Sequence, residues 1–152
     1  MPYFFNTLYL MVLLLTSPWL VYAAIRWGKY REGMGAKLLG RVPHRQGEGR
    51  CVWLHAVSVG EINLLVPLIE SLEREMPGCE FFISTTSKTG YNLARIRYAD
   101  RCVFYCPLDF SWAVRTALRR VRPSLLLLTE TEIWPNMISA AKKQGIPVAI
   151  VN

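Results

Sequence analysis

One glutamate stands where it could take part in proton transfer. Glu61 closes the turn SVGE, which follows the apolar stretch 51–57 (CVWLHAV). A carboxylate at the mouth of a site can accept the proton of an attacking hydroxyl, and Gly60 beside it would let a substrate approach the backbone closely. The spacing Ser58-x-x-Glu61 is also that of a capping box, in which the serine caps a helix and the glutamate bonds back to the serine amide. Both interpretations stay open.

A second group of polar side chains follows a later apolar stretch. Residues 124–129 (SLLLLT) lead directly into ETEIWPN, which brings together Glu130, Glu132, Trp134 and Asn136. Each has an ordinary explanation, since an acid near a helix start favours the helix dipole and a proline in the first turn is common. Two carboxylates, an indole and an amide at one strand end still favour a site.

Hydroxyl groups follow a third apolar stretch. The segment TTSKTG, residues 85–90, contains Thr86 and Gly90 and would begin a helix. Hydroxyls and backbone amides at a helix start suit a phosphate or sulfate group, but the Walker spacing GxxxxGK[ST] is absent and helix capping explains the segment equally well. His55 lies inside the first apolar stretch, where a hydrogen-bonded core position is favoured over a role as a base.

The elements that position these residues alternate regularly. The pattern predicts strands at 51–57, 80–86, 101–105, 124–129 and 148–151, and helices at 61–76, 88–98, 111–121 and 135–144, with Ser111 capping the third. The first and fourth strands are continuously apolar, which is typical of a parallel sheet covered on both faces. We therefore expect a Rossmann-like α/β fold with its ligand site beyond the carboxyl ends of the strands.

The first 25 residues contain no charged side chain. About 20 apolar residues are enough to cross a bilayer, so this segment predicts a membrane anchor. A cleaved signal peptide is the main alternative, because Val21-Tyr22-Ala23 resembles a cleavage site. No basic residue precedes Arg26, however, and the basic residues that follow it favour an uncleaved anchor with the globular part in the cytoplasm.

The net charge of +7 is concentrated after the anchor. Residues 26–50 carry seven positive and two negative side chains, which is +5 of the total. This position beside an apolar segment favours anionic lipid headgroups as partners and argues against nucleic acid. The charges could instead serve only to set the membrane topology. We expect residues 26–49 to form a basic connector and the folded domain to cover 50–152.

The four cysteines, Cys51, Cys79, Cys102 and Cys106, have no metal-like pairing. In the cytoplasm they are expected to be reduced and buried. No metal site and no cofactor are expected.

The stretches HAVSVGE (55–61), STTSKTG (84–90), PLDF (107–110) and ETEIWPN (130–136), in this order and spacing, resemble the 3-deoxy-D-manno-octulosonic acid (Kdo) transferases of lipopolysaccharide assembly. The resemblance implies the N-terminal, acceptor-side domain of a two-domain GT-B glycosyltransferase, whose C-terminal domain binds CMP-Kdo. It implies inverting, metal-free transfer to a lipid A precursor at the bacterial inner membrane. Glu61 would be the general base and Glu130 a second essential carboxylate. Further motif positions are Ser58, Gly60, Thr86, Gly90, Glu132 and Asn136.

The resemblance also implies that a donor domain is needed, so this chain is expected to be an inactive fragment. Two alternatives are a membrane-tethered α/β binding module without catalysis and a glycosyltransferase that acts on another membrane lipid. The first predicts that Glu61 only caps a helix.

Overall fold

A computed structural model describes residues 2–27, 32–129 and 134–151 of the chain. Its helices are α1 (Pro2–Trp27), α2 (Met34–Leu39), α3 (Val59–Glu75), α4 (Lys88–Arg97), α5 (Ser111–Val121) and α6 (Pro135–Lys143). Its strands are β1 (Cys51–His55), β2 (Glu80–Thr85), β3 (Cys102–Tyr105), β4 (Leu125–Thr129) and β5 (Val148–Val151). The predicted strands and helices after residue 50 are all found, with ends that differ by up to two residues.

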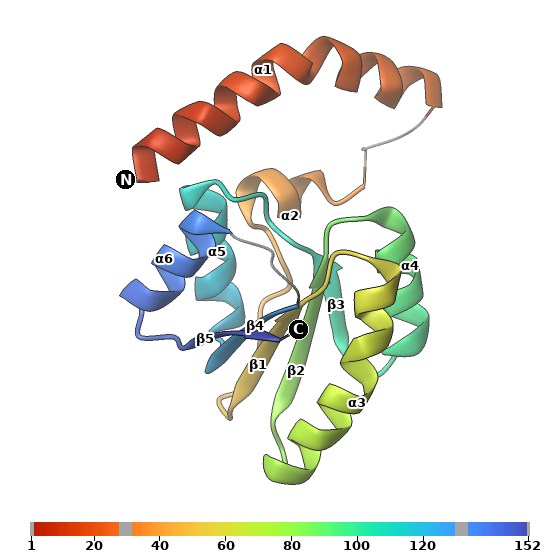
Figure 1. Ribbon diagram of the computed structural model, residues 1–152, viewed down its shortest axis with the longest axis vertical. Helices are drawn as coiled ribbons and strands as arrows, with labels where there is room; N and C mark the ends of the chain where they lie inside the picture. Colours follow the sequence, from red (N-terminus) through yellow and green to blue (C-terminus); the bar gives the residue numbers. More distant parts are fainter. Residues whose placement is uncertain (1, 28–31, 130–133, 152) are drawn as a thin grey trace.

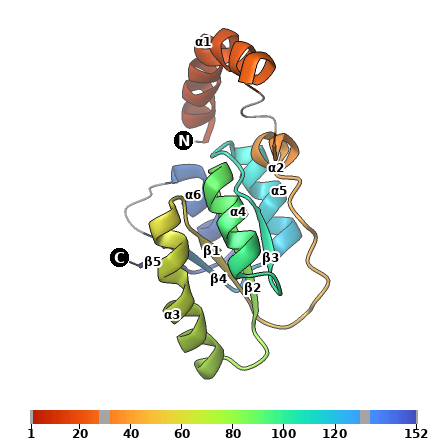
Figure 2. The same cartoon turned by 90° about the vertical axis from the view of Figure 1, so that its right-hand side faces the viewer.

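The five strands form one parallel sheet in the order β3-β2-β1-β4-β5 (Figure 1). The central strand β1 is buried along its whole length. Helices α3 and α4 cover one face and α5 and α6 the other (Figure 2). Each face has its own apolar core, one built around Trp53 and Phe104 and the other around Leu54 and Ile83. The predicted Rossmann-like fold is confirmed.

The start of α5 differs from the prediction. The N-cap residue is Phe110, and its side chain makes no capping hydrogen bond. Ser111 is the first helical residue, and its backbone amide donates to Oδ1 of Asn6 at 3.0 Å. An amide from a distant helix therefore does what a serine N-cap was expected to do, and local sequence could not reveal it.

The segment between α1 and β1 packs against the folded unit. Helix α2 lies against α5, and Val42 is 1% exposed in the core on that face. Gly40 has φ 65° and sits so close to α5 that a Cβ atom there would lie 2.0 Å from the carbonyl oxygen of Ala113. Arg45 is 3% exposed and forms an ion pair with Glu80 at 2.7 Å. Part of the expected connector thus contributes to the packing of the domain.

Helix α1 is apolar enough and long enough to cross a membrane over Phe4–Arg26, with a mean hydropathy of 1.9. It arches over the end of the sheet where the strands terminate (Figure 1). Pro18 lies inside it and removes one backbone hydrogen-bond donor, which allows a bend. The predicted apolar N-terminal helix is confirmed.

Candidate active site

Glu61 lies in the first turn of α3, directly beyond β1, and is 5% exposed. Its Oε1 accepts from the backbone amide of Ser58 at 3.1 Å, and its Oε2 accepts from that of Val57 at 2.9 Å. Ser58 Oγ in turn accepts from the amide of Glu61 at 3.2 Å, which completes the predicted capping box. Thr129, at the end of β4, places its hydroxyl 2.6 Å from Glu61 Oε2.

These contacts set the protonation state of Glu61. Burial raises the pKa of the carboxyl group, but the hydrogen bonds from Thr129, Val57 and Ser58 outweigh burial and bring the pKa below its ordinary value. Glu61 is therefore ionised at neutral pH. A carboxylate has about four acceptor positions, and three are occupied by these donors. The remaining position can accept a proton from a bound hydroxyl.

The N-terminus of α4 lies beside that of α3. Ser87 caps α4 by accepting from the amide of Gly90 at 3.1 Å, and the Ser87 and Thr85 hydroxyls both donate to the carbonyl oxygen of Val57. A Cβ atom at Gly90 would lie 2.7 Å from Thr85 Oγ1, so this glycine is required for packing. Gly60 differs, because a Cβ there would meet only Ser58 Oγ at 3.7 Å. Thr86 is half-buried at the same edge.

His55 is a core residue, as predicted. It is 1% exposed, its Nδ1 lies 2.9 Å from Ser84 Oγ, and burial lowers its pKa to about 4. The ring is neutral at physiological pH and does not act as a base by itself. Its Nε2 has no hydrogen-bond partner among the described residues, so only one of the two ring nitrogens is hydrogen-bonded there. Trp134 packs on it edge-to-face, with ring centroids 5.4 Å apart.

A second polar network joins α6, α5 and α1. Asp109, which is 5% exposed, accepts from the amides of Asn136 at 2.9 Å and Met137 at 2.8 Å and so caps α6. Tyr9 donates to the same carboxylate at 3.2 Å. The Asn136 side chain donates to the carbonyl oxygen of Asp109 and to Oδ1 of Asn6. Burial raises the pKa of Asp109 despite the three hydrogen bonds to its carboxylate.

The structure brings most of the predicted site residues to one edge of the sheet. Ser58, Gly60, Glu61, Thr86 and Gly90 lie together at the starts of α3 and α4. Asn136 belongs to the second network instead, where its amide group donates to neighbouring elements. Two further predicted residues, Glu130 and Glu132, lie outside the described residues.

Sequence reasoning missed two residues that hold the site. Thr129 was treated only as the end of a strand, although a hydroxyl at the carboxyl end of an apolar strand is a recognisable signal. Asn6 lies within the apolar helix α1. It is 8% exposed and donates to Ser111 Oγ at 2.8 Å. A single amide in an uncharged helix indicates a polar contact elsewhere in the fold.

Metal binding finds no support in the part of the chain that the structure describes, where no three His, Cys, Asp or Glu side chains form a group that could hold an ion. Cys51 and Cys106 are buried, whereas Cys79 and Cys102 are partly exposed, so the expectation that all four are buried is wrong for two of them. Cys102 begins β3, and Cys79 directly precedes β2. Burial raises the pKa of Cys51 to about 12, which makes its thiol unreactive.

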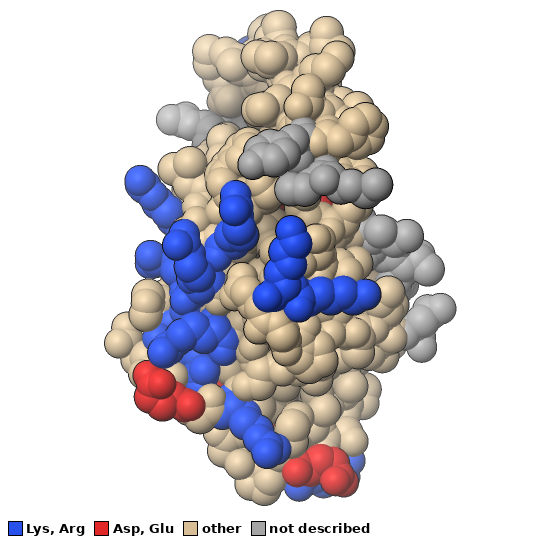
Figure 3. Space-filling view, turned by 90° about the vertical axis from the view of Figure 1, so that its left-hand side faces the viewer, with Lys and Arg blue, Asp and Glu red and all other residues tan. Residues whose placement is uncertain are grey.

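Basic side chains also gather on the face formed by α5 and α6 (Figure 3). The exposed ones on these two helices are Arg115, Arg119, Lys142 and Lys143. Residues 110–129 and 134–151 contain no acidic side chain. The near balance of charge after residue 50 therefore conceals a basic face, since many acidic residues lie on α3 on the other side of the sheet.

The chain shares its fold with a solved structure. It is similar to the crystal structure of MurG from Acinetobacter baumannii, with a TM-score of 0.54 and 13% identity over 67% of this chain and 34% of that chain. The family described as 3-deoxy-D-manno-octulosonic-acid transferase matches residues 30–152. The chain belongs to this Kdo transferase family.

Curated members of the family from several bacteria are similar to this chain. The Kdo transferase of Chlamydia pneumoniae is 30% identical over 98% of this chain and 35% of its own length. The enzyme of Bordetella pertussis is 39% identical over 66% of this chain and 24% of its own length. The chain thus spans about a third of the length of the first of these relatives and less of the second.

Proposed function

We propose that this chain is the acceptor-side domain of an enzyme that transfers Kdo from CMP-Kdo to a lipid A precursor, lipid IVA, in lipopolysaccharide biosynthesis. CMP-Kdo binds to a C-terminal donor domain, and residues 50–152 belong to the acceptor half of the site. The family membership and the GT-B fold support a glycosyltransferase. The lipid acceptor follows from the resemblance to lipopolysaccharide enzymes and from the apolar helix α1.

The observation that carries the proposal is the environment of Glu61. The carboxylate is ionised and held by three donors at the carboxyl edge of the sheet, so these donors fill three of its about four acceptor positions. In the proposed reaction Glu61 accepts the proton of a glucosamine hydroxyl while that oxygen bonds to the anomeric carbon of Kdo. The bond from this carbon to the CMP phosphate breaks on the opposite face, and CMP leaves with the electron pair. The configuration is thereby inverted.

Other predicted residues keep supporting roles in the proposal. Ser58 orients Glu61, and the backbone at Gly60 is open to a substrate. Thr86 and Gly90 belong to an edge where the starts of α3 and α4 favour an acceptor phosphate. Glu130, Glu132 and Asn136 remain predictions from the family motif.

We place the protein at the cytoplasmic face of the bacterial inner membrane, with α1 as its single anchor. The basic face of α5 and α6 supports contact with anionic lipids, each basic side chain near the surface contributing about 1 kcal/mol. Arg45 does not take part, because its guanidinium is buried against Glu80.

The test is Kdo transfer from CMP-Kdo to a tetraacylated lipid A precursor, catalysed by the chain together with the donor domain encoded with it. Glu61→Gln keeps the size and part of the capping, so it is expected to fold and to lose about a hundredfold or more of the rate. Glu70→Gln, on an exposed position of the same helix, is the matched control and should retain the rate.

A folded Glu61→Gln enzyme with near-normal rates would reduce Glu61 to a helix cap. Absence of transfer to any lipid A precursor by a well-folded two-domain enzyme would overturn the proposed function. Transfer to a different membrane lipid would favour another glycosyltransferase specificity.

A further inference from the structure

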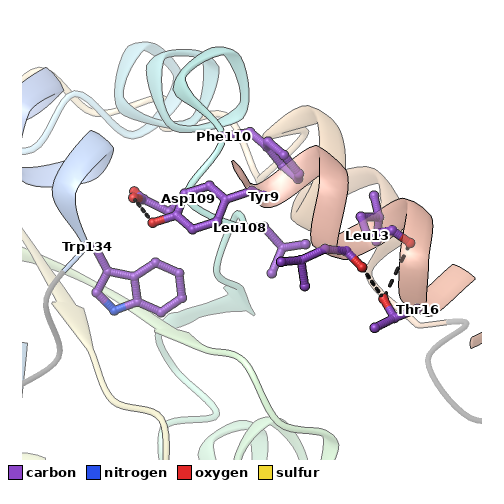
Figure 4. A pocket seen from close by; sticks show the side chains of 8 residues that line it. Tyr9, Leu13, Thr16, Leu108, Asp109, Phe110 and Trp134 are labelled. Carbon is purple, nitrogen blue, oxygen red and sulfur yellow. Dashed lines mark hydrogen bonds between the residues drawn. The ribbon is translucent and has the colours of Figure 1, made fainter. Parts of the chain in front are cut away.

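A cavity of about 340 Å³ lies between α1 and the folded domain (Figure 4). One wall is formed by α1 residues between Tyr9 and Thr16. The opposite wall consists of residues 108–110, in the loop between β3 and α5, together with Trp134 before α6. The cavity therefore sits over the carboxyl edge of the sheet and exists only because α1 is docked there.

Most polar groups around this cavity are bonded to the protein itself, although the indole N–H of Trp134 has no hydrogen-bond partner among the described residues. The Tyr9 hydroxyl donates to Asp109, and both carboxylate oxygens of Asp109 accept from the start of α6. The Thr16 hydroxyl donates to the carbonyl oxygen of Val12 at 2.8 Å. Figure 4 shows the six-membered ring of Trp134 directed towards α1 and its nitrogen directed away. The cavity thus presents an apolar surface and recognises an apolar ligand.

The cavity is continuous with a surface that requires lipid. On α1, Leu14 is 70% exposed and Leu15 is 80% exposed, and no residue from 4 to 25 is charged. An apolar face of this length is stable only when lipid or protein covers it. Val12 both lines the cavity and is 52% exposed, so the rim of the cavity opens onto this apolar face.

The other end of the cavity approaches the proposed base. Trp134 packs on His55, whose carbonyl oxygen lies 2.9 Å from Thr129 Oγ1. The same hydroxyl contacts Glu61. One layer of rings therefore separates the apolar cavity from the edge that carries Glu61.

We propose that this cavity binds an acyl chain of the lipid acceptor and so positions the acceptor headgroup beside Glu61. The inference rests on the proposed function, which supplies a lipid acceptor, and adds a binding site for its hydrocarbon part. Helix α1 is then part of the acceptor site as well as an anchor.

The test uses photoactivatable lipids with the two-domain protein reconstituted in vesicles. A diazirine is placed on an acyl chain of the tetraacylated lipid A precursor in one experiment and on an acyl chain of phosphatidylethanolamine in the other. We expect the acceptor probe to label the loop 108–110 and Trp134, and the phospholipid probe to label the outer face of α1 around Leu14 and Leu15. Equal labelling of the cavity by both probes, or labelling of the outer face alone, would overturn the proposal.

A pair of variants checks the same point without crosslinking. Leu13→Trp fills the cavity, whereas Leu14→Trp adds the same bulk to the exposed face one residue further on. Excluding about two methylene groups from the cavity should weaken acceptor binding about tenfold in the first variant, and the second should bind as the wild type does. Equal binding by both variants would contradict the proposal.

The two proposals fail separately. Labelling of the cavity by the acceptor probe without any Kdo transfer would overturn the proposed reaction and leave the acyl-chain site in place. Kdo transfer with acceptor labels only on the outer face of α1 would overturn the acyl-chain site and leave the proposed reaction in place.

Discussion

Replacing Thr129 by valine tests whether the Thr129 hydroxyl lowers the pKa of Glu61, the proposed base. The substitution keeps the shape of the side chain and removes the hydroxyl that lies 2.6 Å from Glu61 Oε2. A hydrogen bond to a charged group contributes about 1.5–3 kcal/mol. Because one pKa unit corresponds to about 1.4 kcal/mol, the pKa of Glu61 should rise by about one to two units. Thr129→Ser keeps the hydroxyl and is the matched control.

The same substitution should change stability in a pH-dependent way. The folded-state pKa of Glu61 lies below the unfolded value, so Glu61 stabilises the fold fully above about pH 4.3 and loses this effect as the pH falls through the folded pKa. Thr129→Val raises the folded pKa. The free energies of unfolding of wild type and variant should therefore differ most near neutral pH and converge in acid.

Two measurements decide the matter. An NMR titration of the Glu61 carboxyl carbon reports the pKa directly, and urea denaturation at several pH values reports the free energy of unfolding. An unchanged Glu61 pKa in a folded Thr129→Val variant would refute the argument that Thr129 holds the carboxylate in its charged form. A stability loss that is the same at all pH values would point to packing instead.

Three further substitutions follow from contacts in the structure, each read by urea denaturation. Gly90→Ala should lower the free energy of unfolding by about 1–3 kcal/mol because its Cβ overlaps Thr85 Oγ1, whereas the Cβ of Gly60→Ala makes only an ordinary contact with Ser58 Oγ, so this variant should be neutral or slightly stabilising; equal effects would contradict this contrast. Arg45→Met should cost about 1–3 kcal/mol because it removes the hydrogen bonds that the buried guanidinium donates to Glu80 and to the carbonyl oxygen of Gly49. The exposed Arg41→Met should change stability by less than about 0.5 kcal/mol, and a similar loss in both would show that the contacts of the Arg45 side chain contribute little. Asp109→Asn should cost about 1–3 kcal/mol and make the segment between α1 and α2 more sensitive to limited proteolysis; unchanged cleavage would mean that Asp109 does not hold α1.

The sheet was predictable because its signals are local. Continuous apolar strands such as β1 and β4 indicate parallel strands covered on both faces, and Ser58-x-x-Glu61 indicates both a helix start and the position of the candidate base. Once the strands are placed, the starts of α3 and α4 are expected to lie together, because each helix follows a parallel strand and the carboxyl ends of parallel strands meet at one edge of the sheet. For this reason Ser58, Glu61 and Gly90 could be expected near one another.

The contacts of α1 could not be predicted, because they join residues far apart in the sequence. Asn6 and Ser111 are 105 positions apart, and their hydrogen bonds follow from how α1 docks. The basic face of α5 and α6 could not be predicted for a similar reason. A charge count along the chain does not show on which side of the sheet each helix lies. Arg45 counted as part of a basic segment, although its guanidinium is buried against Glu80.

A comparison of Glu61 with Asp109, the two buried carboxylates among the described residues at the carboxyl edge, explains why Glu61 is the better candidate base. Both are 5% exposed and both accept from helix-start amides. Glu61 bonds within its own turn and to Thr129, and these donors lower its pKa, so it is ionised at neutral pH. Asp109 instead links α6 to α1 through Tyr9, and burial raises its pKa. Because Asp109 joins separate elements, moving its proton would disturb the docking of α1. Glu61 can exchange a proton with less disturbance, because most of its donors belong to the turn that it caps.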